Sequence, residues 1–119
     1  KIFIFSPSLI TMNDDPFDRY MGRLADILDE LSSSWEELGR ERSHHKHQTN
    51  LDRKRLVDST GVSNAKAEME VYASKEWLER DQKVSDLEVR VAVLKMRSEI
   101  GHEWINIQRT REATARRVY

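Results

Sequence analysis

The chain of 119 residues contains no cysteine, which excludes disulfide bonds and any metal site that depends on thiolates. No apolar run approaches the roughly 18 to 20 residues that a membrane span requires, so we expect no contact with a membrane. A glycine-rich phosphate loop, a nucleophile elbow and a P-loop are also missing from the sequence. We therefore expect a cytoplasmic protein of a reducing compartment that is not an enzyme and holds no cofactor or metal.

Hydrophobic residues make up 38% and charged residues 34% of the chain, a composition typical of long, largely exposed helices. A chain of this size forms one domain at most, which we place at residues 12–119. Helices that bury only a narrow apolar stripe usually complete the burial against copies of themselves, so we expect a homo-oligomer. Residues 1–11 are interpreted as a non-native or flexible extension, with a strand-like arm that packs on a neighbouring subunit as the alternative.

The charges are segregated along the chain, although the formal net charge is only -1. Residues 14–38 carry eight acidic and two basic side chains, a net of −6, and residues 40–55 carry six basic and two acidic ones, a net of +4. The last eleven residues add four arginines against one glutamate, a net of +3. This segregation predicts a surface that faces a polyanion.

A first helix is predicted from about residue 16 to residue 40. Asp15 is a suitable N-cap, and Pro16 fits the first helical position, where its missing amide costs no hydrogen bond. Downstream, apolar residues recur at alternating steps of three and four, which is the spacing of a coiled-coil seam. The seam residues that we assign to oligomer packing are Leu24, Leu28, Leu31, Trp35 and Leu38.

The seam fails after Leu38, because its continuation falls on Arg42, His45 and Thr49, none of which suits a dry interface. Residues up to about 57 are therefore a solvated helical extension or a polar linker. The segment 58–63 contains Gly61 and predicts the clearest break in the chain.

A second, long helix is predicted from about residue 64 to residue 117, because this stretch has no proline and a single glycine, Gly101, near which a kink is plausible. Its apolar seam, also assigned to oligomer packing, consists of Trp77, Val84, Leu87, Val91, Leu94 and Ile105. The fold class is thus all-α, a long helical hairpin or open V with coiled-coil-like seams.

The histidines and carboxylates do not form a clear metal-binding or acid–base motif. His44 and His47 have the i, i+3 spacing of two metal ligands, but two ligands do not complete a site, and a solvated basic patch is the simpler reading. His102 and Glu103 are adjacent, and adjacent helical residues point about 100° apart, so they do not form an acid–base pair.

Nucleic-acid binding is the sharper hypothesis, because capture of a phosphate backbone requires little more than clustered cations. Trp104 lies among arginines and is a candidate for base stacking, with packing as the alternative. An equally open alternative is that the basic segment docks the acidic first helix of a neighbouring subunit. The candidate DNA-binding residues are Arg40, Arg42, Lys46, Arg53, Lys54, Arg55, Trp104, Arg109, Arg111, Arg116 and Arg117.

Several of these features resemble a family of small phage proteins. A first helix is followed by a basic segment, a break and a long charged helix that ends in arginines; the residues that carry the likeness are Arg53, Lys54, Arg55, Gly61, Val62, Lys66, Ala67, Glu68, Tyr72, Trp77, Arg109, Arg111, Ala113 and Arg116. Over about residues 13–118 the chain resembles the UvsY-type recombination mediators.

This resemblance implies an oligomer that binds single-stranded DNA and helps to load a recombinase or annealing protein onto strands coated by a single-strand binding protein. It implies DNA contact by Lys46, Arg53, Lys54 and Arg55, and a location in the cytoplasm of the phage host. The acidic first helix departs from the family pattern and favours contact with a basic partner. The alternative function is a helical scaffold or chaperone-like interaction protein that does not bind DNA.

Overall fold

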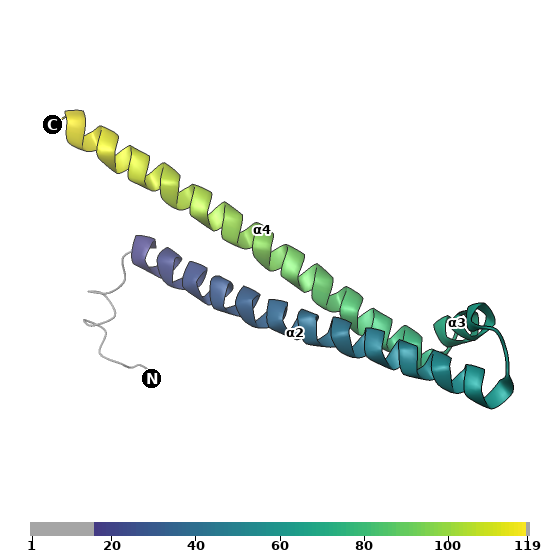
Figure 1. Ribbon diagram of the computed structural model, residues 1–119. Helices are drawn as coiled ribbons and strands as arrows, with labels where there is room; N and C mark the ends of the chain where they lie inside the picture. Colours follow the sequence, from purple (N-terminus) through teal and green to yellow (C-terminus); the bar gives the residue numbers. More distant parts are fainter. Residues whose placement is uncertain (1–15, 119) are drawn as a thin grey trace, which may run out of the picture. The chain divides into compact units, whose positions relative to one another are not determined.

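The computed structural model describes residues 16–118, and this part of the chain consists of helices joined by short turns, without a β-strand (Figure 1). Its elements are α2 (Pro16–Thr60), α3 (Asn64–Tyr72) and α4 (Lys75–Val118). The expected all-α helical hairpin is therefore confirmed. Residues 1–11, interpreted above as an extension, lie outside the described residues.

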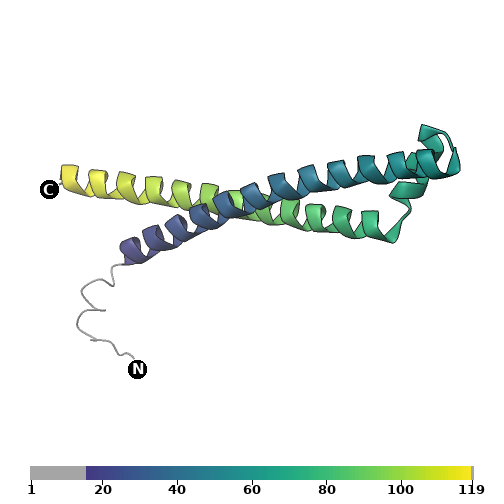
Figure 2. The ribbon, with the colours of Figure 1, turned by 60° about the horizontal axis from the view of Figure 1, so that its bottom comes forward.

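The chain divides into two compact units, each built from one stretch of α2 and one stretch of α4 that run antiparallel (Figure 2). Of the described residues, unit 1 contains 16–31 and 93–118. Unit 2 contains Ser32–Ala92 and therefore includes the turn of the hairpin and α3. The two units are described separately below.

Helix α2 begins at Pro16, as predicted, but it is longer than the sequence pattern indicated. It continues without interruption through the polar segment after Leu38 and ends at Thr60. Of the two alternatives for residues 40–55, the helical extension is the one observed, and the polar linker is not. Their apolar seam ends, but polar contacts with α4 take its place, as shown below.

Gly61 ends α2 and confirms the predicted break. Its φ angle of 72° lies in the left-handed region, which glycine adopts without a steric penalty. The Gly61 amide donates to the Val57 carbonyl at 3.0 Å and so satisfies one of the free carbonyls at the helix end. The chain then turns, and the Ser63 hydroxyl accepts a hydrogen bond from the Lys66 amide at 3.2 Å, which caps α3.

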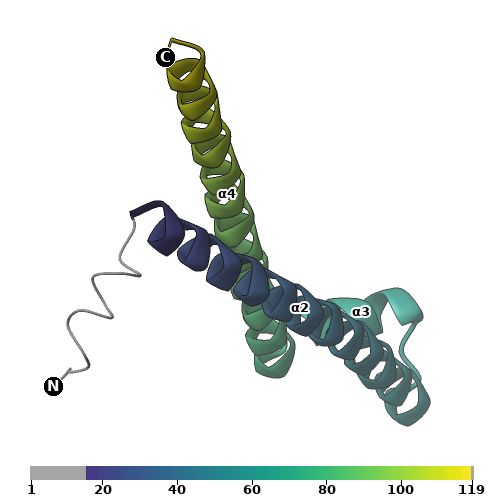
Figure 3. The same ribbon diagram turned by 90° about the vertical axis from the view of Figure 1, so that its left-hand side faces the viewer.

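The predicted single helix over residues 64–117 is wrong, because the chain breaks at Ala73 and Ser74, between α3 and α4. The Ser74 amide donates to the Val71 carbonyl at 3.0 Å, and the Ser74 hydroxyl donates to the same carbonyl at 2.6 Å. That hydroxyl also accepts from the Trp77 amide at 3.3 Å, so one serine closes α3 and caps α4. The break places α3 beside the end of α2 (Figure 3).

The core of unit 1 is small and includes Leu24 of α2 with Leu94 and Ile105 of α4, all buried. Gly101 of α4 is also buried, and a Cβ atom added to it would lie 2.8 Å from Leu24 Cδ1. Glycine therefore lets the two helices approach closely at this point. The kink that we considered near Gly101 is not needed, because α4 runs through this residue as one helix.

Unit 2 has the larger core. Leu38 of α2 and Val84, Leu87 and Val91 of α4 are buried there, together with the side chain of Ser34. Helix α3 closes this core at the hairpin end through its own two buried residues, Ala67 and Val71. Burial of each such aliphatic side chain contributes about 1.5–3 kcal/mol, except for the smaller alanine.

The predicted seam of α2 divides into two rows. Leu24 and Leu38 are buried and Leu31 is half-buried, but Leu28 and Trp35 are exposed. The residues just before them, Ile27 and Ser34, are less exposed. At these two positions the row that faces α4 is therefore shifted by one residue from the predicted seam. Leu28 and Trp35 are thus available to a partner, as an oligomer contact requires.

The predicted seam of α4, in contrast, packs within the chain. Its five aliphatic members are buried and Trp77 is half-buried; the five are Val84, Leu87, Val91, Leu94 and Ile105. The chain's own helices provide this burial, so these residues need no neighbouring subunit. Their assignment to oligomer packing is therefore corrected to packing inside the hairpin.

Candidate nucleic-acid interface

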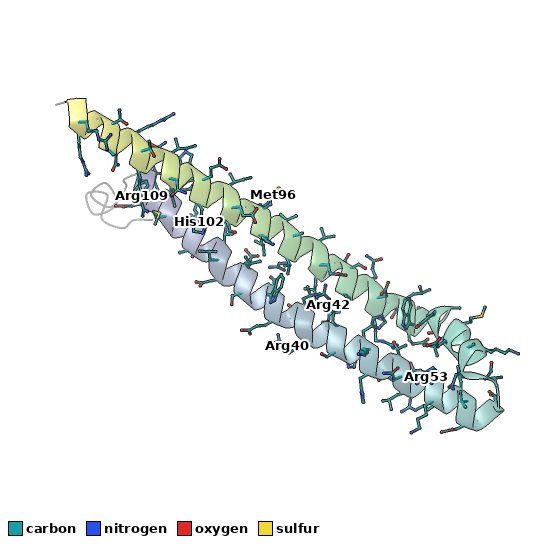
Figure 4. The ribbon with its side chains drawn as sticks, turned by 45° about the horizontal axis from the view of Figure 1, so that its top comes forward. Arg40, Arg42, Arg53, Met96, His102 and Arg109 are labelled. Carbon is teal, nitrogen blue, oxygen red and sulfur yellow. The ribbon has the colours of Figure 1, made fainter. Side chains whose placement is uncertain are left out.

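The basic residues of α2 in unit 2 form two rows because the whole segment is helical. The outer row contains Arg40, His44, His47 and Lys54, at steps of four, three and seven residues, and all four side chains are exposed. Arg40 points away from α4 (Figure 4). This row faces solvent along about 21 Å of helix, from the rise of 1.5 Å per residue.

The second row lies on the flank of α2 and contains Trp35, Arg42, Lys46 and Arg53. Steps of seven, four and seven residues place these side chains on one face of the helix. Trp35 is 57% exposed, an unusual state for a large apolar ring. An exposed indole therefore lies in line with three cationic side chains.

The flanking cations differ in how strongly the protein holds them. Arg42 Nη2 donates to Glu88 Oε2 of α4 at 2.8 Å, and Arg53 Nη1 donates to Asn64 Oδ1 at 2.8 Å. Arg42 accordingly points toward α4 (Figure 4). Lys46 is exposed and forms no ion pair with any described residue.

Two further predicted residues complete this surface. Lys54 of the outer row forms no ion pair within the described part of the chain. Arg55 is largely exposed and only loosely paired, with 3.8 Å between its Nη1 and Asp52 Oδ1. Together with Arg40 and Lys46, unit 2 thus presents three free cations on α2. We call the two rows, together with Arg55, the α2 basic face.

The arginines near the end of α4 belong to unit 1, so the structure assigns the two predicted basic sets to different units. Arg109, Arg111, Arg116 and Arg117 are all exposed. Arg116 Nη2 lies 3.9 Å from Glu112 Oε2, one helical turn earlier, which is a weak surface pair. DNA contact by these four residues stays a prediction.

Trp104, the predicted stacking residue, is half-buried and packs inside unit 1. Its ring centroid lies 4.1 Å from that of Tyr20 and 6.1 Å from that of Phe17, both on α2. A ring held between two aromatic side chains gains packing energy and presents little free face to a base. Trp35, which the sequence pattern had assigned to packing, is instead an exposed aromatic residue in the same helical row as cations.

A partly buried polar cluster continues the contact between α2 and α4 where the apolar seam stops. Arg80 Nε donates to His45 Nδ1 at 3.2 Å, and Arg80 Nη2 donates to Asp52 Oδ2 at 3.4 Å. The His45 ring packs on Trp77 with 4.9 Å between centroids. Because Nδ1 accepts, the proton of a neutral His45 lies on Nε2.

The Nε2 atom of His45 is buried and has no hydrogen-bond partner among the described residues. It lies 3.4 Å from Asp81 Oδ1, close enough for electrostatic attraction without hydrogen-bond geometry. Lys83 Nζ adds a further cross-helix pair, 3.0 Å from Glu41 Oε1. The sequence analysis missed this cluster because it took polar residues at seam positions to mean that the helices no longer pack there. Complementary charges at heptad spacing on the two helices could have indicated the cluster.

A hollow in unit 2 shares Asp52 with this cluster. The hollow in unit 2 is open and is lined by Asp52, Arg55, Leu56, Glu70, Val71, Ser74 and Glu76. Within the described residues, no three or more His, Cys, Asp or Glu side chains gather as a metal site would require. His44 and His47 are exposed members of the outer row.

No family model, curated protein or solved structure matches the sequence or the fold. None of the helices described here is long and apolar enough to span a bilayer. The function is therefore inferred from the residues of the α2 basic face.

Proposed function

We propose that this protein binds single-stranded DNA through the α2 basic face and acts as a recombination mediator, assembled from several copies. The observation that carries the proposal is the exposed Trp35 in one row with Arg42, Lys46 and Arg53. Proteins that bind single strands combine cations that follow the backbone with aromatic rings on which bases stack. Duplex DNA hides its base faces, so the exposed indole favours a single strand.

The binding would be electrostatic and independent of sequence. Arg40, Lys46 and Lys54 are free to neutralise phosphates, and Arg55 needs to give up only a 3.8 Å contact with Asp52. Arg42 and Arg53 keep protein partners and would bind phosphate only in competition with them. A few phosphate contacts per chain give weak affinity, which an assembly multiplies through its raised effective concentration.

The role as a mediator follows from the same features and from the resemblance to UvsY-type proteins. An open helical face with no enclosing groove would hold a strand extended and release it readily to a recombinase or annealing protein. Loading of such a partner is the step that the proposal assigns to the assembled protein.

Charge reversal tests the proposal. The triple variant Arg40→Glu, Lys46→Glu and Lys54→Glu changes only exposed side chains without ion-pair partners, so we expect it to fold normally. It should lose most of its affinity for a labelled single-stranded oligonucleotide in fluorescence anisotropy. Lys66→Glu, an exposed position on α3, is the matched control and should bind almost as wild type. Unchanged affinity of the triple variant would refute the assignment.

A second function, a helical interaction protein without DNA binding, is favoured by the number of apolar side chains left uncovered. Among the described residues, eleven large hydrophobic side chains are exposed and nine hydrophobic residues are buried. Such side chains, where they gather in a patch, would suit contact with a protein partner. Absence of DNA binding at low salt, together with stable self-association, would favour this function.

A further inference from the structure

Unit 1 carries an apolar stripe on α4 that no described residue covers. Val93, Met96, Ile100 and Ile107 are exposed at steps of three, four and seven residues, the spacing of a coiled-coil seam. Met96 and Ile100 are 58% and 59% exposed. Met96 points away from α2, so this stripe is separate from the core that joins the helices of unit 1 (Figure 4).

The stripe ends in a shallow hollow that could receive a side chain from another helix. The hollow surrounds Ile107 and is lined in addition by Glu103, Asn106, Thr110 and Arg111. Apolar knobs from a facing helix fill such hollows in coiled coils. The side of α4 that faces away from α2 therefore has both the spacing and the shape for another helix.

Helix α2 carries a second, smaller exposed row in unit 1. Met21 and Leu28 are exposed and lie seven residues apart, so they occupy the same face of the helix. This row belongs to a different helix from the α4 stripe. Unit 1 thus offers two distinct apolar surfaces rather than one.

The charges around the two surfaces are opposite in sign. In unit 1, α2 carries four acidic and two basic residues, a net of −2, and α4 carries six basic and three acidic residues up to Arg117, a net of +3. Two copies of the α4 stripe facing each other would bring like net charge together. An α4 stripe facing the α2 row of another copy would bring opposite charges together.

The individual side chains agree with this pairing. Asp18, Asp26 and Asp29 of α2 form no ion pair with any described residue, and the same holds for Arg109 and Arg111 of α4. These charges are therefore not paired within the described part of the chain, although they lie in the same unit. A second copy would offer each set its complement.

We propose that copies of this chain associate head to tail, with the α4 stripe of one copy packed on the Met21 and Leu28 row of the next. Such a heterologous contact leaves one free surface on each side, so it continues until a ring closes or a filament forms. This assembly supplies the several copies on which the proposed DNA binding relies. The head-to-tail contact is tested in the absence of DNA. A negative result would therefore refute this contact without refuting DNA binding by the α2 basic face.

The test uses two full-length variants, Met96→Glu with Ile100→Glu and Met21→Glu with Leu28→Glu. All four side chains are exposed, and circular dichroism should show that both variants keep the helical content of the wild type. Light scattering should give a mass well above 14.0 kDa for the wild type and the monomer mass for each variant. Leu78→Glu, at an exposed position of α4 in unit 2, is the control and should assemble as wild type.

The decisive sample is an equimolar mixture of the two variants. Each retains one intact surface, so a head-to-tail contact predicts a dimer of twice 14.0 kDa that grows no further. A mixture that stays monomeric would overturn the proposal. So would a monomeric wild type, or a Met21→Glu, Leu28→Glu variant that assembles as well as wild type, which would indicate contact through α4 alone.

Discussion

Arg80 donates a hydrogen bond to His45 across the hairpin, at 3.2 Å from Nε to Nδ1. The same guanidinium reaches Asp52 at 3.4 Å, and the His45 side chain is only 13% exposed. A single arginine of α4 thus bonds to two polar side chains of α2 in a partly buried interface. The helices of unit 2 stay paired through this contact, although the apolar seam of α2 has ended at Leu38.

Removal of this arginine should destabilise the protein more than removal of an exposed one. Arg80→Ala leaves Asp52 without its cross-helix partner and His45 without a donor, at a cost of about 1–3 kcal/mol in the free energy of unfolding. Arg42→Ala breaks a solvent-exposed pair with Glu88 and should cost about 0–1 kcal/mol. Urea denaturation at one protein concentration measures both, and equal losses would contradict the structural role of Arg80.

The close approach at Gly101 predicts a contrast between glycines. Gly22 and Gly39 have no atom within 4 Å of an added Cβ, so Gly→Ala at either position should stabilise the protein by about 0.5–1 kcal/mol through helix propensity. Gly101→Ala should not give this gain, since its Cβ would press on the buried Leu24 at 2.8 Å.

Gly101→Val extends the same comparison. A larger side chain adds overpacking to the contact with Leu24, and we expect a loss of about 1–3 kcal/mol. Thermal unfolding followed by circular dichroism compares the four variants. Stabilisation by Gly101→Ala equal to that at Gly39 would show that the helices do not meet closely there.

Trp35 should be the tryptophan that reports DNA binding. It is 57% exposed, whereas Trp77 and Trp104 are half-buried against other rings. Trp35→Ala should weaken single-strand binding by about 1–3 kcal/mol, the usual contribution of one stacked base. It should also remove the quenching of intrinsic fluorescence on addition of DNA. Leu78→Ala, another exposed apolar residue of unit 2, is the control.

The sequence predicted those parts of the fold that depend on local chemistry. Pro16 and Gly61 mark the ends of α2 through backbone properties that any reader of the sequence can recognise. The break at Ala73 and Ser74 was missed because no proline or glycine marks it. Ser74 makes the break through local hydrogen bonds with Val71 and Trp77, and serine also occurs inside helices, so its residue type alone did not mark the cap.

The side chains of the candidate site were harder to predict, because burial depends on which face of a helix meets its partner. A shift of one residue on α2 exposed Leu28 and Trp35 and covered their neighbours. Heptad spacing alone does not distinguish a seam within a hairpin from one between chains. The sequence showed residues 40–55 as a basic group, but their division into free and paired cations required the contacts with α4 and α3.

The most direct measurement is a titration of labelled single-stranded DNA by fluorescence anisotropy at several salt concentrations, with a duplex of equal length as the control. We predict that log affinity falls linearly with log salt and that the single strand binds more tightly than the duplex. The Arg40→Glu, Lys46→Glu, Lys54→Glu variant should show a shallower slope, reduced by about 0.7 for each lost phosphate contact. A salt-independent signal, or no binding at low salt, would contradict the proposed function.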